Sequence, residues 1–310
     1  MGNDARRHES VGGGQKLPDR DYVVESTTGS ESNERYESRF RGQNPVEVEG
    51  YGADGGPSLV DEDHADRHVD REESGRIEMV IGVDDRVRVR NTAAFPWRTI
   101  CSLRMEAGDG SRFIGSGVLV GPRTVVTAGH CVYFHRHGGF AKEIEVIPGR
   151  DGGVRPFGAV FASRFYTVRG WVDERLSDFD YGAVLLPTDL GERVGTMGFA
   201  SLATGTLRNL MVNNAGYPGD RPGAAEPGDP PTGTTMWWNA SQVAEVTDSK
   251  IGYTLDTFGG QSGSPVWRYV SSSGQRAIVG LHTTGDARAN SATRINDSVF
   301  ENISRWIQAD

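Results

Sequence analysis

From about residue 80 onward, short apolar stretches alternate with polar and glycine-rich stretches. Runs rich in β-branched and aliphatic residues occupy positions 118–120, 124–126, 183–186 and 277–281, with Gly, Pro or Asp between them. This pattern predicts short strands joined by tight turns. It is typical of an all-β barrel or sandwich.

The end of the chain follows a different period. An apolar face recurs there at helical spacing, formed by Val299, Ile303, Trp306 and Ile307. Ser298 and Glu301 have the spacing of a capping box, which marks the start of a helix. The spacing therefore predicts a C-terminal helix that docks by one apolar face.

Residues 1–78 show almost no periodic apolar pattern and mix charged residues with Gly and Ser. They carry 19 Asp+Glu against 10 Lys+Arg, which equals the net charge of −9 of the whole chain. We predict that residues 1–78 form an acidic, largely disordered leader or pro-segment and that residues 79–310 form the folded domain. Composition alone would also fit a tail with no task.

The predicted folded domain is electrically balanced, with 23 residues of each sign. It therefore offers no basic field for a phosphate backbone, and we expect no nucleic-acid partner. No apolar span is long enough to cross a bilayer, so we expect no membrane partner either.

The two cysteines, Cys101 and Cys131, permit one disulfide and exclude a multi-cysteine zinc site. A single bridge would suit an exported protein, although the first residues lack the apolar core of a signal peptide. His135 and His137 lie close together, but no Cys or carboxylate set completes a metal site around them. We predict no catalytic metal and no cofactor, and the pattern leaves a structural calcium site open.

Three polar residues stand in local contexts that suit nucleophilic catalysis. His130 follows an apolar run and small residues, Asp180 precedes a buried strand, and Ser262 lies between Gly260 and Gly263. A serine nucleophile needs an imidazole to accept its proton and a carboxylate to orient that imidazole. Because the order His, Asp, Ser is one of the few known for such triads, we predict these roles for the three residues. The amides of Gly260 and Ser262 are the predicted oxyanion hole.

With these motifs the chain resembles the chymotrypsin-like serine proteases, and more closely their bacterial glutamyl endopeptidase branch. The resemblance extends from about Val80 to Trp306, and it rests on matching runs in the same order. These runs include Thr127-Ala128-Gly129-His130-Cys131, Asp180-Tyr181-Gly182-Ala183, Gly216-Tyr217-Pro218-Gly219-Asp220, Gly259-Gly260-Gln261-Ser262-Gly263-Ser264-Pro265 and His282-Thr283-Thr284-Gly285.

The resemblance implies both a fold and an activity. The fold would be two six-stranded antiparallel β-barrels with a C-terminal helix. The activity would be that of a secreted, monomeric serine endopeptidase that cuts proteins or peptides through an acyl-enzyme and is made as a zymogen.

The residues around Ser262 point to two different substrates. Asp256 stands six residues before Ser262, where the resemblance to trypsin-like enzymes puts the carboxylate that binds Arg or Lys. Thr257 and His282 instead match positions that hold a substrate glutamate in glutamyl endopeptidases. An imidazole and a hydroxyl donate hydrogen bonds to a carboxylate but give a guanidinium no negative partner. We therefore predict cleavage after Glu, with Asp weaker.

Two alternatives stay open at this point. The first is cleavage after Arg or Lys with Asp256 in the pocket. The second is an inactive, protease-like binding module.

The resemblance also bears on activation. Trypsin-like enzymes pair a new N-terminal ammonium with an Asp before the catalytic Ser, but Gln261 stands there in this chain. In glutamyl endopeptidases the new N-terminus lies near the specificity pocket, and the matching start here is around Met79. Because Glu78 precedes it, we predict self-processing between Glu78 and Met79.

The cysteines depart from the family pattern. Chymotrypsin-like enzymes commonly bridge the cysteine after the catalytic His to one at the position where Gly115 stands here. Cys101 lies on the preceding predicted strand, and we expect it to be the partner of Cys131.

Overall fold

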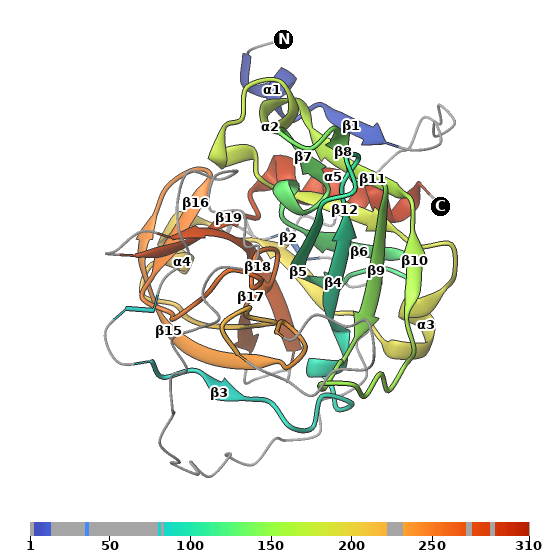
Figure 1. Cartoon of the computed structure of the whole chain (residues 1–310). Coiled ribbons are helices and arrows are strands. Elements are labelled where there is room, and N and C mark those ends of the chain that lie inside the picture. The colour runs from blue at the N-terminus through green and yellow to red at the C-terminus, as the bar shows by residue number, and fades with distance from the viewer. Residues whose placement is uncertain are drawn as a thin grey trace.

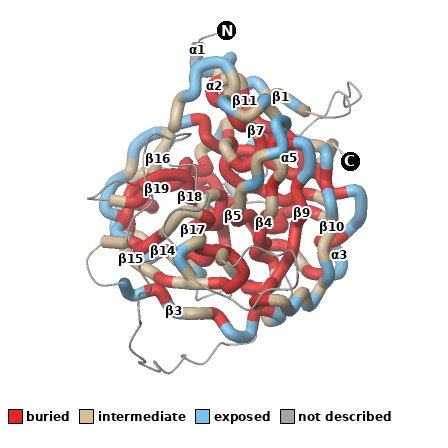
Figure 2. The backbone as a smooth tube through the Cα atoms, in the orientation of Figure 1, coloured by how far each residue is buried: buried red, intermediate tan, exposed pale blue. Residues whose placement is uncertain are grey.

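The computed structural model describes residues 3–13, 35–36, 80–81, 84–221, 232–270, 275–285 and 289–309. Two barrel-like β-sheets lie side by side in this part of the chain, as Figure 1 shows. Their buried residues fill the inside of each sheet and the space between them (Figure 2). The predicted all-β fold with two barrels is confirmed.

The first sheet is antiparallel and has the order β1-β11-β12-β6-β5-β4-β9-β10. Its strands are β1 (Ser10–Gly13), β4 (Ile100–Glu106), β5 (Arg112–Leu119), β6 (Thr124–Thr127), β9 (Glu143–Pro148), β10 (Val160–Ala162), β11 (Arg164–Val168) and β12 (Gly182–Leu185). Both faces of β6 are covered, because Val125 packs with the barrel's own core and Val126 packs with the core shared with the second barrel. This double burial explains why the predicted strand at 124–126 is apolar without interruption.

The second sheet is mainly antiparallel and has the order β17-β14-β15-β16-β19-β18-β13-β2, with β17 also paired to β18. Its strands are β2 (Arg35–Tyr36), β13 (Gly198–Ser201), β14 (Met211–Gly216), β15 (Trp237–Val246), β16 (Lys250–Tyr253), β17 (Pro265–Val270), β18 (Gln275–Gly285) and β19 (Asn290–Arg294), and β3 (Val87–Arg88) pairs with β15. The pairing of β13 with β18 is parallel. A small separate sheet joins β7 (Tyr133–Phe134) to β8 (Gly139–Phe140).

The helices of the described residues are short except the last. They are α1 (Asn3–Arg7), α2 (Arg169–Val172), α3 (Leu190–Val194), α4 (Thr204–Leu207) and α5 (Asp297–Gln308), with single 3₁₀ turns η2 (Trp97–Thr99), η3 (Gly129–Cys131) and η4 (Ser177–Phe179). No helix among them has the length and apolar content of a membrane span.

Helix α5 is the predicted C-terminal helix, and its predicted apolar face is buried. It packs against both barrels, since Phe300 lies 4.9 Å from Phe199 of β13 and Trp306 lies 6.0 Å from Tyr166 of β11, measured between ring centroids. The predicted cap was wrong by two residues. Asn296 is the cap, because its side chain accepts the Val299 N–H at 3.0 Å.

The first residues of the predicted leader pack on the first barrel. Strand β1 pairs with β11 and so extends that sheet at one edge. Helix α5 holds it from the side, because Asn302 donates to the His8 carbonyl at 2.8 Å and Trp306 donates to Ser10 Oγ at 2.8 Å. Residues 3–13 are therefore part of the folded unit, whereas most of positions 14–79 lies outside the described residues.

Candidate active site

Strand pairing brings His130 and Asp180 together. His130 lies in η3 directly after β6, Asp180 ends η4 directly before β12, and β6 pairs with β12. Asp180 Oδ2 lies 2.8 Å from His130 Nδ1, and Asp180 Oδ1 accepts the His130 backbone N–H at 2.9 Å. Asp178, the other carboxylate nearby in the sequence, is exposed.

The pair is electrostatically coupled. Burial alone would lower the pKa of His130, but the negative charge of Asp180, helped by Cys131, raises that pKa well above its usual value. Burial would also raise the pKa of Asp180, yet the charge of His130 and its hydrogen bonds outweigh burial and lower it. The Asp180 side chain is 1% exposed, so its charge acts on His130 with little screening by water.

A tight loop carries Ser262 to the same place. The Ser262 carbonyl accepts the Ser116 N–H of β5 at 2.8 Å and the thiol of Cys131, the residue after His130, at 3.7 Å. Gly263 has φ +82°, and a Cβ atom added there would lie 2.0 Å from Thr127 Oγ1. Only glycine permits this close approach.

The predicted oxyanion loop makes a tight turn at Gly260. Gly260 has φ +102°, and a Cβ atom added there would lie 2.6 Å from the Tyr217 carbonyl. Its carbonyl is held by Ser116 Oγ at 2.8 Å, while its N–H donates to no described residue. This N–H is therefore free to donate to a developing oxyanion.

His282 lies beside this loop on β18. Its carbonyl accepts the Gly263 N–H at 2.7 Å, and its own N–H donates to the Ser264 carbonyl at 2.9 Å. The imidazole is fully buried, and its Nδ1 lies 2.7 Å from the hydroxyl of Tyr253. No motif in the sequence marks Tyr253, although its position three residues before Asp256 places it near the pocket residues.

Thr257 is also fully buried. Its hydroxyl has no hydrogen-bond partner among the described residues. A buried hydroxyl without a partner is unfavourable by about 1–3 kcal/mol, so this group is suited to receive a polar group of a ligand.

The Asp256 carboxylate binds backbone groups of the protein itself, whereas the resemblance to trypsin-like enzymes would have it bind a substrate Arg or Lys. Its Oδ1 accepts the Ile81 N–H at 2.6 Å, and its Oδ2 accepts the Asp85 N–H at 2.9 Å. Asn239 ties the same two segments together by donating to Asp85 Oδ1 and to the Asp256 carbonyl, both at 3.2 Å. Asp256 thus ties the backbone at Ile81 and Asp85 to the segment that precedes Ser262.

The predicted disulfide is wrong, because both cysteines are buried free thiols. In the β4–β5 hairpin Cys101 pairs with Gly117, whereas Leu103 pairs with Gly115. A Cβ atom added at Gly115 would lie 3.0 Å from Cys131 Sγ. Cys101 stands two residues further along its strand, or roughly 7 Å, and so faces a different part of the core.

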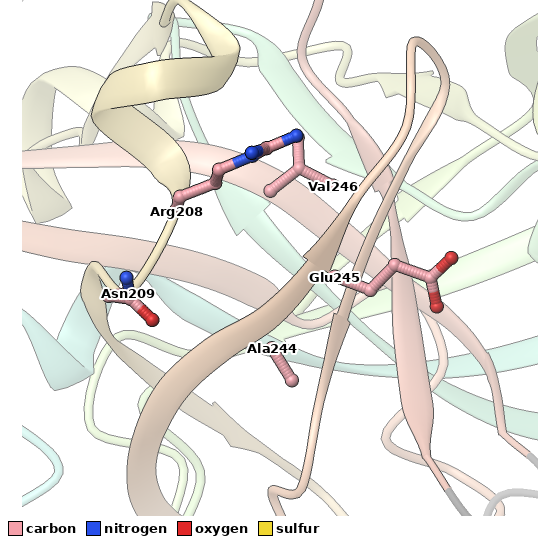
Figure 3. A pocket seen from close by; sticks show the side chains of 5 residues that line it. All are labelled: Arg208, Asn209, Ala244, Glu245 and Val246. Atoms are coloured by element: carbon pink, nitrogen blue, oxygen red, sulfur yellow. The ribbon is translucent and has the colours of Figure 1, made fainter.

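Glu78 and Met79 are outside the described residues. His137 contacts Asp109 at 2.8 Å, and the described part of the chain contains no group of three or more His, Cys, Asp or Glu side chains suited to a metal. A surface pocket beside α4 and β15 contains none of the predicted site residues (Figure 3). It is lined by Arg208, Asn209, Ala244, Glu245 and Val246.

The structure has two β-barrels, a His–Asp pair at the ends of two paired strands of the first barrel, and a glycine-flanked serine loop beside that pair. Together these features define a chymotrypsin-like serine endopeptidase. Comparison with known proteins agrees with this class. The family model described as Trypsin matches residues 86–307. The chain belongs to this family, in its glutamyl endopeptidase branch.

Individual relatives narrow the assignment. The glutamyl endopeptidase of Bacillus licheniformis is 38% identical, over 74% of this chain and 69% of that protein. A Bacillus subtilis protein named extracellular metalloprotease is also 38% identical, over 73% of this chain and 69% of that protein. A solved structure of a Glu endopeptidase in complex with MPD has a TM-score of 0.62 and 27% identity, and it covers 74% of this chain and 99% of its own.

Proposed function

We propose that the protein hydrolyses peptide bonds after glutamate, and more weakly after aspartate, in protein or peptide substrates. Ser262 is the nucleophile, His130 the general base and Asp180 the carboxylate that orients it. The enzyme acts as a monomer, without a cofactor and outside the cell. The observation that carries the proposal is the combination of a buried, unpartnered Thr257 hydroxyl with an Asp256 carboxylate already occupied by backbone N–H groups.

The site geometry supports a reaction through an acyl-enzyme. His130 Nε2 accepts the proton of Ser262 as the hydroxyl oxygen attacks the scissile carbonyl, and Asp180 on Nδ1 stabilises the resulting imidazolium. The N–H groups of Gly260 and Ser262 stabilise the oxyanion, each typically worth about 3 kcal/mol in the transition state. His130 then protonates the leaving amine, and water hydrolyses the acyl-enzyme by the same steps in reverse.

The pocket chemistry supports a carboxylate at the cleaved residue. When the Tyr253 hydroxyl donates to Nδ1 of His282, the ring proton lies on Nε2, which can then donate to a substrate. The Thr257 hydroxyl supplies a second donor. A guanidinium is disfavoured here, because Thr257 and His282 carry no negative charge for it and the Asp256 carboxylate is turned toward the backbone N–H groups of Ile81 and Asp85.

The test uses three peptides that differ only in Glu, Gln or Arg before the scissile bond. We expect kcat/KM for the Glu peptide to exceed that for Gln by at least about 100-fold, because the pocket donors would face a neutral amide. Thr257→Val should reduce the Glu preference, and Thr206→Val, at a helix remote from the site, is the matched control. Faster hydrolysis after Arg would refute the assignment, and no hydrolysis would favour the inactive module.

We also propose that residues 1–78 are removed as a pro-segment by cleavage between Glu78 and Met79. Glu78 has the side chain that the proposed pocket accepts, so the enzyme can recognise its own leader. Purified wild-type chain should develop a new N-terminus at Met79, and Ser262→Ala should not. Cleavage of the purified Ser262→Ala chain at the same bond would refute self-processing, and another new N-terminus in the wild type would refute the site.

A further inference from the structure

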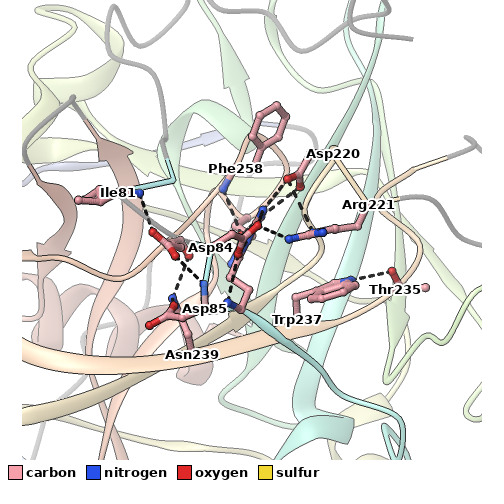
Figure 4. A network of polar contacts seen from close by, with 12 residues as sticks. Ile81, Asp84, Asp85, Asp220, Arg221, Thr235, Trp237, Asn239 and Phe258 are labelled. Carbon is pink, nitrogen blue, oxygen red and sulfur yellow. Dashed lines mark hydrogen bonds and ion pairs between the residues drawn. The ribbon is translucent and has the colours of Figure 1, made fainter. Parts of the chain in front are cut away.

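A buried arginine lies at the junction of three segments of the active-site region. Arg86 follows the stretch that Asp256 anchors, and its side chain is 0% exposed. The guanidinium pairs with Asp84 and Asp220, and its Nη1 also donates to Gln261 Oε1 at 3.3 Å. In Figure 4, Asp84, Asp220 and Phe258 lie close together in one network of polar contacts.

Gln261 is the residue directly before Ser262, and it is fully buried. Besides Arg86, its Oε1 accepts the Phe258 N–H at 3.1 Å, and its Nε2 donates to Asn214 Oδ1 at 3.2 Å. The side chain of Gln261 therefore connects Arg86 to both ends of the loop from Phe258 to Ser262, and this loop contains the predicted oxyanion donors.

Asp220 connects a third segment to the same guanidinium. It follows Gly219, whose N–H donates to the Gly259 carbonyl of the oxyanion loop at 2.7 Å. Because a buried guanidinium needs its charge partners, Arg86 holds Asp84 and Asp220 in place as much as they hold it.

We propose that Arg86 is a positioning residue for catalysis, because its buried guanidinium fixes Gln261 and so the loop that carries the oxyanion donors and Ser262. The Arg86 side chain thus supplies a positive charge beside Gln261, the residue that precedes Ser262. The loop is consequently held in its working form before the leader is removed. This inference rests on the proposed function in taking Ser262 as the nucleophile.

The test compares Arg86→Gln and Arg86→Lys with Arg88→Gln in the full-length chain. Arg88 is the matched control, because it lies two residues away and loses only an ion pair with Asp151. Arg86→Gln removes a hydrogen bond from a charged donor, so we expect kcat per active site to fall by about 10- to 100-fold. KM should change less than about threefold. Arg88→Gln should stay within about twofold of wild type.

The rate at which a fluorophosphonate labels the serine is a second measurement, made on gels that separate uncleaved from cleaved chain. Wild type should label in both forms, and Arg86→Gln should label more slowly in both. If Arg86→Gln does not fold, Arg86→Lys carries the test, since it keeps the charge but loses the planar fork.

The outcomes separate this inference from the proposed function. No labelling of cleaved wild type would refute Ser262 as the nucleophile. If wild type is labelled but both Arg86 variants have the same kcat as Arg88→Gln, the positioning role of Arg86 is refuted and the proposed function is not. Labelling of only the cleaved form would refute a loop that is formed before cleavage.

Discussion

Asp256→Asn distinguishes the two substrate specificities that the sequence left open. In the structure the carboxylate accepts two backbone N–H groups, from Ile81 at 2.6 Å and from Asp85 at 2.9 Å. An asparagine has one acceptor oxygen, so it can keep one of these hydrogen bonds, and its NH₂ group must face the other N–H. We expect the free energy of unfolding to fall by about 1.5–3 kcal/mol, the usual contribution of a hydrogen bond to a charged group. For a domain of this size the midpoint of thermal unfolding should drop by roughly 3–12 °C.

Activity should respond in a way that depends on the role of Asp256. If it anchors the chain, kcat/KM for the Glu peptide, normalised to titrated active sites, should change less than about threefold. If it binds a substrate cation, kcat/KM for the Arg peptide should fall by about 100-fold or more. The assay is kcat/KM for both peptides, together with thermal unfolding, on wild type, Asp256→Asn and Asp189→Asn, in which an exposed carboxylate is neutralised. A selective loss of Arg cleavage with unchanged stability would refute the anchoring role.

Three further changes test the core, the His–Asp pair and the N-terminal strand, in that order. In Gly115→Cys the new thiol should form a disulfide with Cys131. This disulfide should stabilise the oxidised protein by up to about 3 kcal/mol relative to Gly115→Ser. Peptide mapping that found a different disulfide would contradict the packing of the β4–β5 hairpin. Because Asp180 raises the pKa of His130, kcat/KM of wild type should fall as the pH drops below that raised value and His130 becomes protonated. In Asp180→Asn this acid limb should move to lower pH and kcat should fall by about 10,000-fold, whereas identical acid limbs would contradict the coupling. Removal of residues 3–13 should lower the free energy of unfolding by roughly 1 kcal/mol for each lost side-chain hydrogen bond without changing kcat per site, and an unchanged urea midpoint would show that the segment adds no stability.

The fold and the His–Asp pair could be predicted because local sequence determines them. A buried strand leaves an uninterrupted apolar run, and a tight turn needs glycine or another small residue. Both marks surround His130, Asp180 and Ser262, and the structure brings the strands that carry the first two together.

The errors and omissions have a common physical origin. The partners of Asp256 are backbone N–H groups, which every residue except proline possesses, so no residue type marks them in advance. The disulfide prediction failed on strand register, because a shift of two positions along β4 separates Cys101 from the place opposite Gly115. The proposed role of Arg86 depends on contacts with Asp220 and Gln261, which lie in segments far from Arg86 in the sequence. No single segment therefore predicts these contacts.

The free thiols have a practical consequence. Cys101 and Cys131 are buried and unbridged, so the fold of the described residues requires no oxidation step. The protein should therefore fold under reducing conditions and keep its activity in dithiothreitol. Substrates rich in disulfides could then be reduced and cleaved in the same tube.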